Sequence, residues 1–574
     1  MAAQSFSWRL WACLGLVCGC GPGAKVDPTE GTTGTETGTP DTEDLPTGDG
    51  TTLMMEGPNS VVIAENRAVD LLFVIDNSGS MGVAQARLSQ AIGALVGVLE
   101  APDTRADYRI GVTTTDSGNP RCPAATYKPE AGNLVLSSCV DRIDQAEFTF
   151  NSEDFSAACT DQCSKRDSDL SVLATATEVD QKQQPRKWVE RIAGQLNVSG
   201  ADAVEALQCY LPQGVAGCGF ESHLESMYLA LAAAMAKDSK NNYGFVRQAA
   251  QLAVVFVSDE TDCSYNQGTK EIFTTNKVFW DDPVNDTAPT SGLCWRAGVA
   301  CSGGPGVYSE CHAENYDAAG SPGASDADAV LQPVSKYIDF LKAIEQQKQA
   351  IDEGQRVKVS LLTGVPPGYD MFAAEIGYED SLDPEYQRNF GIGPGCLLGD
   401  PNLPGWGAVP PVRERELAEA FVDQPGEQRR LYSLCDADYS AALTEIGTEI
   451  AEAMAPACMP NCVRDTDPET AVLDPSCTLY EEHLLENTKV EIVPCVEMNG
   501  AWVPPNGATL CFAYLVDPNG ASTPSGLDDM SPHCVLEGFN LEFSIVRTAA
   551  APANTLISAS CELSANKKLD CPKL

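Results

Sequence analysis

The chain has 574 residues, of which 43% are hydrophobic, and this is long enough for two sizeable folded cores. Acidic side chains outnumber basic ones by 81 to 37, which gives a formal net charge of −44 at pH 7. A charge of this sign repels nucleic acid and anionic membrane surfaces, so the composition disfavours both as direct partners.

Twenty-three cysteines indicate an oxidising compartment. Three of them lie in the first twenty residues, which leaves an even number for disulfides. The pairs Cys159-x₃-Cys163 and Cys458-x₃-Cys462 have the spacing of zinc ligands, but the four histidines are scattered, so disulfides are favoured over zinc. The disulfide candidates are Cys122, Cys139, Cys159, Cys163, Cys209, Cys218, Cys263, Cys294, Cys301, Cys311, Cys396, Cys435, Cys458, Cys462, Cys477, Cys495, Cys511, Cys534, Cys561 and Cys571.

The N-terminus is typical of a secreted, anchored protein. Residues 1–19 read as a signal peptide, and Val17-Cys18-Gly19-Cys20 resembles a bacterial lipobox. That resemblance implies cleavage before Cys20 and a lipid on it; an ordinary cleaved signal is the alternative. Residues 20–57 are rich in Thr, Gly, Pro and acidic residues, and they are predicted to form a disordered tether.

The first folded strand is followed by a set of oxygen-bearing side chains. Residues 71–75 are apolar without a break, as in a strand buried on both faces. Asp76, Ser78 and Ser80 follow at alternate positions, and Gly79 permits a tight turn between them. Oxygen ligands at the carboxyl end of such a strand suit a divalent cation such as Mg²⁺, Ca²⁺ or Mn²⁺.

The pattern of strand and helix then continues, with an interruption. An apolar stripe predicts a helix over residues 84–99, and residues 108–115 predict a second strand that ends at Asp116. Periodicity is lost near residues 117–198, which are interpreted as a disulfide-pinned insertion with sheet elements at 133–136 and 147–150. Helices are predicted at 201–211 and 223–237.

Residues 252–258 form another, mostly apolar run, like residues 71–75, and predict a second strand buried on both faces; this strand is also followed by an acid, Asp259. An irregular insertion follows near residues 263–325, and its aromatic residues Trp280, Trp295 and Tyr308 form either a recognition surface or a small satellite core. A helix after residue 330, a third buried strand at 357–362 and a helix at 439–454 complete the first domain, residues 58–456.

Beyond residue 456 the sequence changes to short alternating segments at 489–493, 510–516, 541–546 and 556–563. Twelve of the candidate cysteines lie before this boundary and eight after it, both even numbers. Residues 457–574 are therefore predicted to be a small β-rich domain stapled by its own disulfides.

The Asp-x-Ser-x-Ser run at Asp76 resembles the metal-ion-dependent adhesion site of von Willebrand factor type A domains. The resemblance implies a doubly wound, mostly parallel α/β sheet with a divalent cation at its top edge. Ser78 and Ser80 would bind the cation directly, Asp76 and Asp259 largely through water, and an acidic side chain of a protein partner would complete the shell. Where the family has a Thr before the central helix, this chain has Glu221 and Ser222, and Glu221 is either a further ligand or a helix-opening residue.

The leading hypothesis is therefore a non-enzymatic, lipid-anchored adhesion protein of a Gram-negative cell envelope, which contacts the membrane only through its N-terminal lipid. One alternative is a structural envelope protein whose cation only stabilises the fold. Another is a metal-dependent hydrolase, which needs a general base near the cation; His223 is the one histidine near a predicted site element.

Overall fold

The computed structural model describes residues 60–63, 67–101, 104–192, 194–350, 354–399, 407–422, 428–452, 454, 456–483, 488–498, 500–548 and 555–574. All of them belong to one compact unit, Met55–Leu574. The predicted signal peptide, the lipid-bearing Cys20 and the tether lie outside the described residues.

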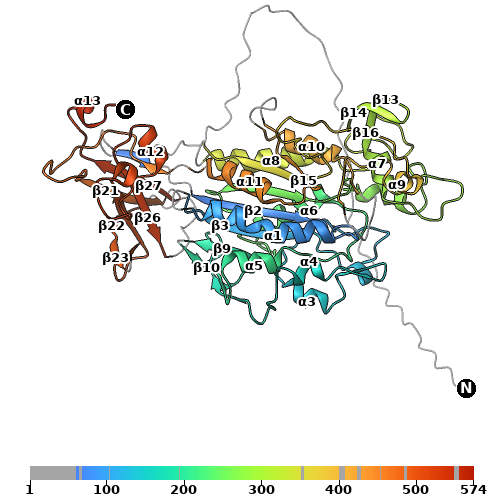
Figure 1. Cartoon of the computed structure of the whole chain (residues 1–574), viewed down its shortest axis with the longest axis horizontal. Coiled ribbons are helices and arrows are strands. Elements are labelled where there is room, and N and C mark those ends of the chain that lie inside the picture. Colours follow the sequence, from blue (N-terminus) through green and yellow to red (C-terminus); the bar gives the residue numbers. More distant parts are fainter. Residues whose placement is uncertain are drawn as a thin grey trace, which may run out of the picture. The chain divides into compact units, whose positions relative to one another are not determined.

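A seven-stranded sheet forms the centre of the region predicted as the first domain (Figure 1). Five adjacent strands are parallel, and β9 adds antiparallel to β3 at one side. Long runs of apolar and β-branched residues explain why the inner strands are buried on both faces. The order is β10 (Gln195–Leu196), β9 (Trp188–Ile192), β3 (Asp107–Thr114), β2 (Ala68–Ile75), β12 (Gln251–Val257), β15 (Val357–Thr363) and β19 (Leu431–Ser433).

Helices cover both faces of this sheet, because successive side chains of each strand point to opposite sides. Leu71 and Phe73 of β2 belong to the core beneath α1 (Gly82–Leu99), α5 (Ala203–Tyr210) and α11 (Ser440–Glu452). Leu72 and Val74 belong to the core beneath α6 (His223–Met235), α8 (Val334–Gln349) and α10 (Val412–Glu419). The predicted α/β class with a mostly parallel sheet is confirmed.

Helix α1 is the one helix of the described residues that is long and apolar enough to cross a membrane by length and composition. More than half of it, 56%, is buried inside the protein. Its apolar stripe, which includes Leu88, Ile92 and Leu95, packs in the same core as α11. The apolar character of α1 is therefore that of a core helix.

The first insertion differs from its prediction in two places. Residues 133–136 form no strand, although the Val135 N–H donates to the Val112 carbonyl at 2.8 Å. Strands β9 and β10 lie in the region expected to be irregular, and β9 extends the central sheet from Trp188. The expected element at 147–150 is a two-residue strand, β4 (Thr149–Phe150), paired with β5 (Glu153–Asp154).

The second insertion builds satellite cores around α7 (Gly292–Gly298), β13 (Val299–Gly303) and β14 (Val307–Ala313). Trp280 and Trp295 are 4% and 6% exposed, and Tyr308 packs against the same core as Trp295. The satellite-core interpretation therefore holds for Trp280 and Trp295, which are withdrawn from solvent, while Tyr308 is half-buried at the edge of the same core.

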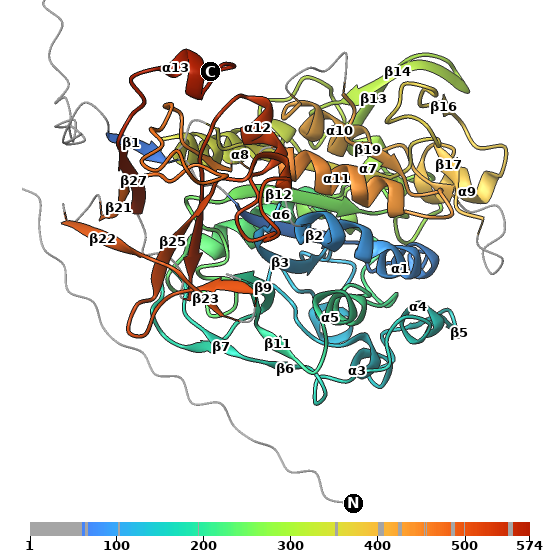
Figure 2. The ribbon, with the colours of Figure 1, turned by 60° about the vertical axis from the view of Figure 1, so that its left-hand side comes forward.

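A second seven-stranded sheet occupies the C-terminal region. Its order is β1 (Ser60–Ile63), β27 (Thr555–Cys561), β21 (Cys477–His483), β22 (Thr488–Pro494), β25 (Leu510–Leu515), β26 (Glu542–Arg547) and β20 (Ala457–Cys458). Strand β1, which the sequence assigns to the first domain, instead pairs antiparallel with β27 (Figure 2). Both ends of the described chain therefore contribute to the C-terminal sheet.

The twenty candidate cysteines form ten disulfides, which confirms the prediction of an oxidised protein. None of these bonds joins a cysteine before residue 456 to one after it. The pairs are Cys122–Cys218, Cys139–Cys159, Cys163–Cys209, Cys263–Cys294, Cys301–Cys311, Cys396–Cys435, Cys458–Cys534, Cys462–Cys571, Cys477–Cys561 and Cys495–Cys511.

Candidate functional site

Two predicted site residues, Asp76 and Asp259, lie at the carboxyl ends of neighbouring parallel strands. Ile75 of β2 is in register with Val257 of β12, so the chain leaves both strands at the same edge of the sheet. The Asp76 N–H donates to the Val257 carbonyl at 2.9 Å, which ties the two strand ends together. Pairing of β2 with β12 therefore brings Asp76 and Asp259 close together, although they are far apart in the sequence.

The loop that follows β2 is shaped by hydrogen bonds to Asp76. Its Oδ1 accepts from the backbone N–H of Ser78 at 2.7 Å, and its Oδ2 accepts from the Ser258 hydroxyl at 2.6 Å. The Ser80 hydroxyl in turn bonds the Asp259 carboxyl. The structure therefore brings Asp76, Ser78, Ser80 and Asp259 into one buried cluster.

Three buried oxygens that belong to predicted site residues have no hydrogen-bond partner among the described residues. They are Ser78 Oγ, Asp259 Oδ1 and Glu221 Oε1, and they come from three different segments of the chain. Buried polar atoms normally have a partner, because an unmet one costs roughly 1–3 kcal/mol. Hydroxyl and carboxylate oxygens are also the ligands that hard divalent cations prefer, so the donor set fits such an ion.

Glu221 and Ser222 behave differently from each other. Glu221 is fully buried, and its Oε2 accepts a hydrogen bond from the Thr115 hydroxyl while Oε1 is unpartnered. The Ser222 hydroxyl instead donates to the Cys263 carbonyl at 3.2 Å, so its hydrogen is already used by the protein. Of Glu221 and Ser222, Glu221 is therefore the residue whose side chain has an oxygen without a hydrogen-bond partner.

The site concentrates carboxyl groups in a buried volume. Burial, with the charge of Asp76, raises the pKa of the Asp259 carboxyl to about 8. Burial and the charges of Asp76 and Glu260 raise the pKa of Glu221, and burial with Asp76 and Asp259 raises that of Glu260. A bound dication would lower all of these pKa values, because it favours the ionised carboxylates.

Glu260 was not among the predicted site residues, although it directly follows Asp259. Its backbone N–H donates to Ser258 Oγ at 3.0 Å, and its side chain lines the cavity above the site. The signal that could have found it is the run of acids after β12. Position in the run does not tell which of those acids point inward.

His223 is fully buried and contacts the cluster through Ser258. Its Nε2 lies 2.6 Å from Ser258 Oγ, and its Nδ1 lies 3.2 Å from Glu414 Oε1. Ser258, His223 and Glu414 follow one another as serine, histidine and acid do in a hydrolytic triad. However, the Ser258 hydroxyl donates to Asp76, and neither Ser258 nor His223 lines either of the two described cavities. The arrangement therefore orients Asp76 and does not expose a nucleophile.

A cavity of about 290 Å³ opens directly over the loop after β2. Ser78, Gly79 and Ser80 line it from below, and both insertions contribute to its wall. Phe150 comes from the first insertion, while Pro289, Thr290 and Ser291 come from the second. The insertions thus frame the site and leave it open to a ligand of side-chain size.

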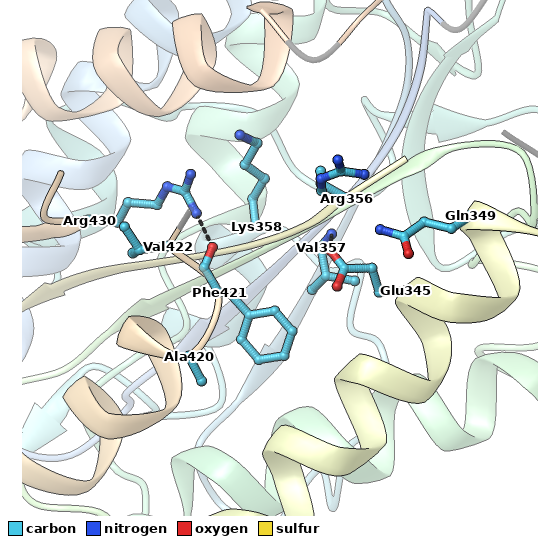
Figure 3. A pocket seen from close by; sticks show the side chains of 9 residues that line it. All are labelled: Glu345, Gln349, Arg356, Val357, Lys358, Ala420, Phe421, Val422 and Arg430. Atoms are coloured by element: carbon cyan, nitrogen blue, oxygen red, sulfur yellow. Dashed lines mark hydrogen bonds between the residues drawn. The ribbon is translucent and has the colours of Figure 1, made fainter. Parts of the chain in front are cut away.

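A second cavity of about 270 Å³ shares no residue with the first (Figure 3). It lies where β15 and β19 begin, whereas the predicted site lies where β2 and β12 end. Arg430 donates to the Phe421 carbonyl at 2.6 Å (Figure 3). Arg430 also pairs with Glu449, and Glu345 accepts a hydrogen bond from the Val357 N–H. These groups connect α8, α10 and α11 to the sheet.

The zinc alternative is wrong for both cysteine pairs considered. Cys139, Cys159 and Cys163 have sulfurs close enough to share a metal, but they belong to two disulfides. Cys458 and Cys462 are likewise bonded, to Cys534 and Cys571. A disulfide sulfur carries no thiolate charge for a metal, so these clusters are covalent staples.

No protein-family model matches this chain, and no curated protein matches it. Solved structures give distant matches. The pilus adhesin SpaC of Lactobacillus rhamnosus GG is 9% identical at a TM-score of 0.25, over 87% of this chain and 40% of SpaC. The vWF domain of the type V pili tip protein Mfa5 of Porphyromonas gingivalis is 9% identical at 0.25, over 69% of this chain and 97% of that domain. The pilus adhesin RrgA of Streptococcus pneumoniae is 10% identical at 0.24, over 88% and 58%. At such values, function is argued from the site itself.

Proposed function

We propose that this chain is a cell-envelope binding protein whose type A-like domain holds a divalent cation and uses it to capture an acidic group of a protein partner. The observation that carries the proposal is the set of three buried, unpartnered oxygens on Ser78, Asp259 and Glu221. A bound cation would supply a partner for unpartnered oxygens of this kind.

The residues divide into two roles. Ser78, Asp259 and Glu221 offer free oxygens to a Mg²⁺, Ca²⁺ or Mn²⁺ ion, while Asp76 and Ser80 hold the shape of the loop and the neighbouring carboxyl. Ser222 remains a candidate ligand, because its hydroxyl oxygen keeps lone pairs while its hydrogen is donated to the Cys263 carbonyl. The cavity above Ser78 leaves a direction from which an external carboxylate would approach.

The cellular setting is part of the same proposal. Ten disulfides agree with an extracytoplasmic location, and the lipobox-like Cys20 supplies an anchor to a Gram-negative envelope. A tether behind the lipid would hold the binding domain away from the membrane. We infer no enzymatic activity, since among the described residues the buried Ser258 and His223 of the site line neither of the two cavities.

A purely stabilising cation is the second candidate, and Glu221 is the observation that favours it. A direct carboxylate in place of the neutral Thr would reduce the residual positive charge available to a partner. The two functions differ in their response to an added carboxylate: only the binding function predicts cation-dependent capture.

The first test is thermal unfolding of the oxidised protein with EDTA or with Mg²⁺, Ca²⁺ or Mn²⁺. At a hundredfold excess over the dissociation constant, a specific site adds about 2.7 kcal/mol to the free energy of unfolding. Ser78→Ala should leave the stability in EDTA nearly unchanged, because its hydroxyl has no partner to lose, yet it should reduce the cation-induced shift.

Asp76→Ala tests the loop as a whole, and Asp238→Ala, which removes an exposed acid far from the site loop in sequence, is the matched control for surface binding. Equal shifts in wild type, Ser78→Ala and Asp76→Ala would mean that the cation binds the acidic surface, and the proposal would be rejected.

A further inference from the structure

Three phenylalanines line the cavity over the candidate cation site, and nothing in the cation chemistry itself requires them. We propose that they form a subsite for an apolar side chain, so that the preferred partner presents a carboxylate with an apolar residue next to it. This inference rests on the proposed function and specifies the partner. The three rings, Phe150, Phe220 and Phe390, are called the aromatic collar below.

Phe150 lies directly against the loop that holds the candidate ligands. A Cβ on Gly79 would stand 2.4 Å from three atoms of the Phe150 ring, so only a glycine lets the ring approach this closely. The next contact is similar, because a Cβ on Gly82 would stand 2.6 Å from the Phe155 ring. The segment containing β4 and β5 is therefore fitted onto the site loop, and it places Phe150 at the rim of the cavity.

The other two rings are held by aromatic neighbours. Phe220 directly precedes the candidate ligand Glu221, and it makes an edge contact with Phe273 at a centroid distance of 5.3 Å. Phe390 packs against Tyr386 at 4.5 Å, and the Tyr386 hydroxyl donates to the Gly407 carbonyl at 2.7 Å. Because each ring is supported from behind, the collar is preorganised and little conformational entropy is lost on binding.

Two hydroxyls of the cavity wall are committed to the protein. Ser291 donates its hydroxyl to the Gly219 carbonyl at 2.8 Å, and Thr290 donates its hydroxyl to the Arg388 carbonyl at 2.7 Å. Glu260 is the one charged residue in the described lining, and it is 8% exposed. A basic side chain next to the partner's carboxylate would therefore meet no exposed acid in the cavity. An apolar side chain at the same position would contact the phenylalanine rings.

The size of the cavity agrees with this occupant. About 290 Å³ is at the lower end of the range for small-ligand sites, so it suits a carboxylate and one adjoining side chain. A folded surface could present such a pair on one loop. The committed occupant is therefore an Asp or Glu side chain adjoined by an apolar or aromatic residue of a protein partner.

The test measures binding of the intact oxidised protein to immobilised, end-capped peptides in Mn²⁺ and in EDTA. Four peptides share Gly flanks and differ at the central pair: Asp-Phe, Asp-Ser, Asp-Lys and Asn-Phe. In Mn²⁺ we expect Asp-Phe to bind about tenfold more tightly than Asp-Ser, because burial of one aromatic side chain is worth this much or more. Asn-Phe should bind no better in Mn²⁺ than in EDTA.

Phe150→Ala and Phe220→Ala should reduce the ratio of the affinity for Asp-Phe to the affinity for Asp-Ser toward one. The Mn²⁺-induced thermal shift and the weaker binding of Asp-Ser should persist. Phe150→Leu should retain part of the preference, which guards against misfolding of the alanine variant. Phe372→Ala, an exposed ring that does not line the cavity, is the matched control and should keep the full ratio.

Equal binding of Asp-Phe and Asp-Ser, or tighter binding of Asp-Lys, overturns the apolar subsite and leaves the cation-bridged function standing. Loss of the Mn²⁺-induced thermal shift in the wild-type protein would instead overturn the proposed function and this inference with it. Cation-dependent shifts without cation-dependent binding of any peptide reject the subsite and favour the stabilising cation.

Discussion

The Ser258 hydroxyl donates a hydrogen bond of 2.6 Å to Asp76 Oδ2, and this bond joins the ends of two neighbouring parallel strands. On its other side Ser258 Oγ lies 2.6 Å from His223 Nε2. The carboxylate at the centre of the predicted site is thereby held by Ser258, which itself contacts His223, and His223 Nδ1 lies 3.2 Å from Glu414 Oε1. Such outer contacts commonly tune a metal site as strongly as a ligand does.

The first prediction concerns this orienting contact. Ser258→Ala should weaken cation binding by about tenfold, because Asp76 loses the bond that fixes its carboxylate. The measurement is titration of Mn²⁺ followed by calorimetry. Ser360→Ala, a buried serine on β15, is the control and should leave the affinity unchanged. An unaltered affinity in Ser258→Ala would show that Asp76 needs no such support.

The second prediction concerns pH. Burial raises the pKa of Asp259 to about 8 and that of Asp116 to about 6, both above their unfolded values. The folded state then holds more protons than the unfolded state between about pH 4 and pH 8, so in EDTA the free energy of unfolding should fall as pH rises through this range. The cation needs ionised carboxylates, so its stabilising effect should grow over the same range.

Thermal unfolding in EDTA and in Mn²⁺ across this pH range measures both slopes. Asp259→Asn should flatten the decline in EDTA and diminish the gain with Mn²⁺, since one titrating group is removed. A stability in EDTA that rises with pH from 5 to 8 would contradict the assigned pKa shifts.

The third prediction concerns the disulfide Cys122–Cys218, which links the first insertion to the loop that carries Glu221. It closes 96 residues of sequence, and replacing both cysteines by serine should cost about 2–5 kcal/mol. The loop before α6 should also loosen, and cation affinity should fall with it. The same replacement at Cys301–Cys311, which spans 10 residues of a hairpin, is the control and should cost less.

The fourth prediction concerns the segment between β1 and β2. Arg67 donates to Glu542 Oε1 at 3.0 Å, and the Glu542 side chain is only 1% exposed. Arg67→Ala leaves a buried carboxylate without its cation, so we expect a loss of about 3–5 kcal/mol in urea unfolding. The exposed pair Arg464–Glu562 is the control, and Arg464→Ala should cost at most about 1 kcal/mol. Similar costs for both variants would show that Glu542 is not held as described.

The elements closest to the site were predictable because their signals are local. Unbroken apolar runs marked β2, β12 and β15, and an acid after the first two predicted a shared edge of the sheet. The apolar stripe of α1 follows from its 3.6-residue repeat. The even cysteine count likewise indicated a fully disulfide-bonded protein without revealing which cysteines pair.

Other features depend on pairing between distant segments, and no local pattern marks them. Strand β9 lies inside an irregular insertion but joins the central sheet by pairing with β3. Strand β1 joins the C-terminal sheet by pairing with β27. The inward direction of Glu221 and the seat of Phe150 on Gly79 are set by packing between loops. The sequence by itself determined which residues carry the candidate oxygen ligands. Only the tertiary structure decided which of those oxygens have no hydrogen-bond partner and what surrounds them, because burial and contact are properties of the assembled chain.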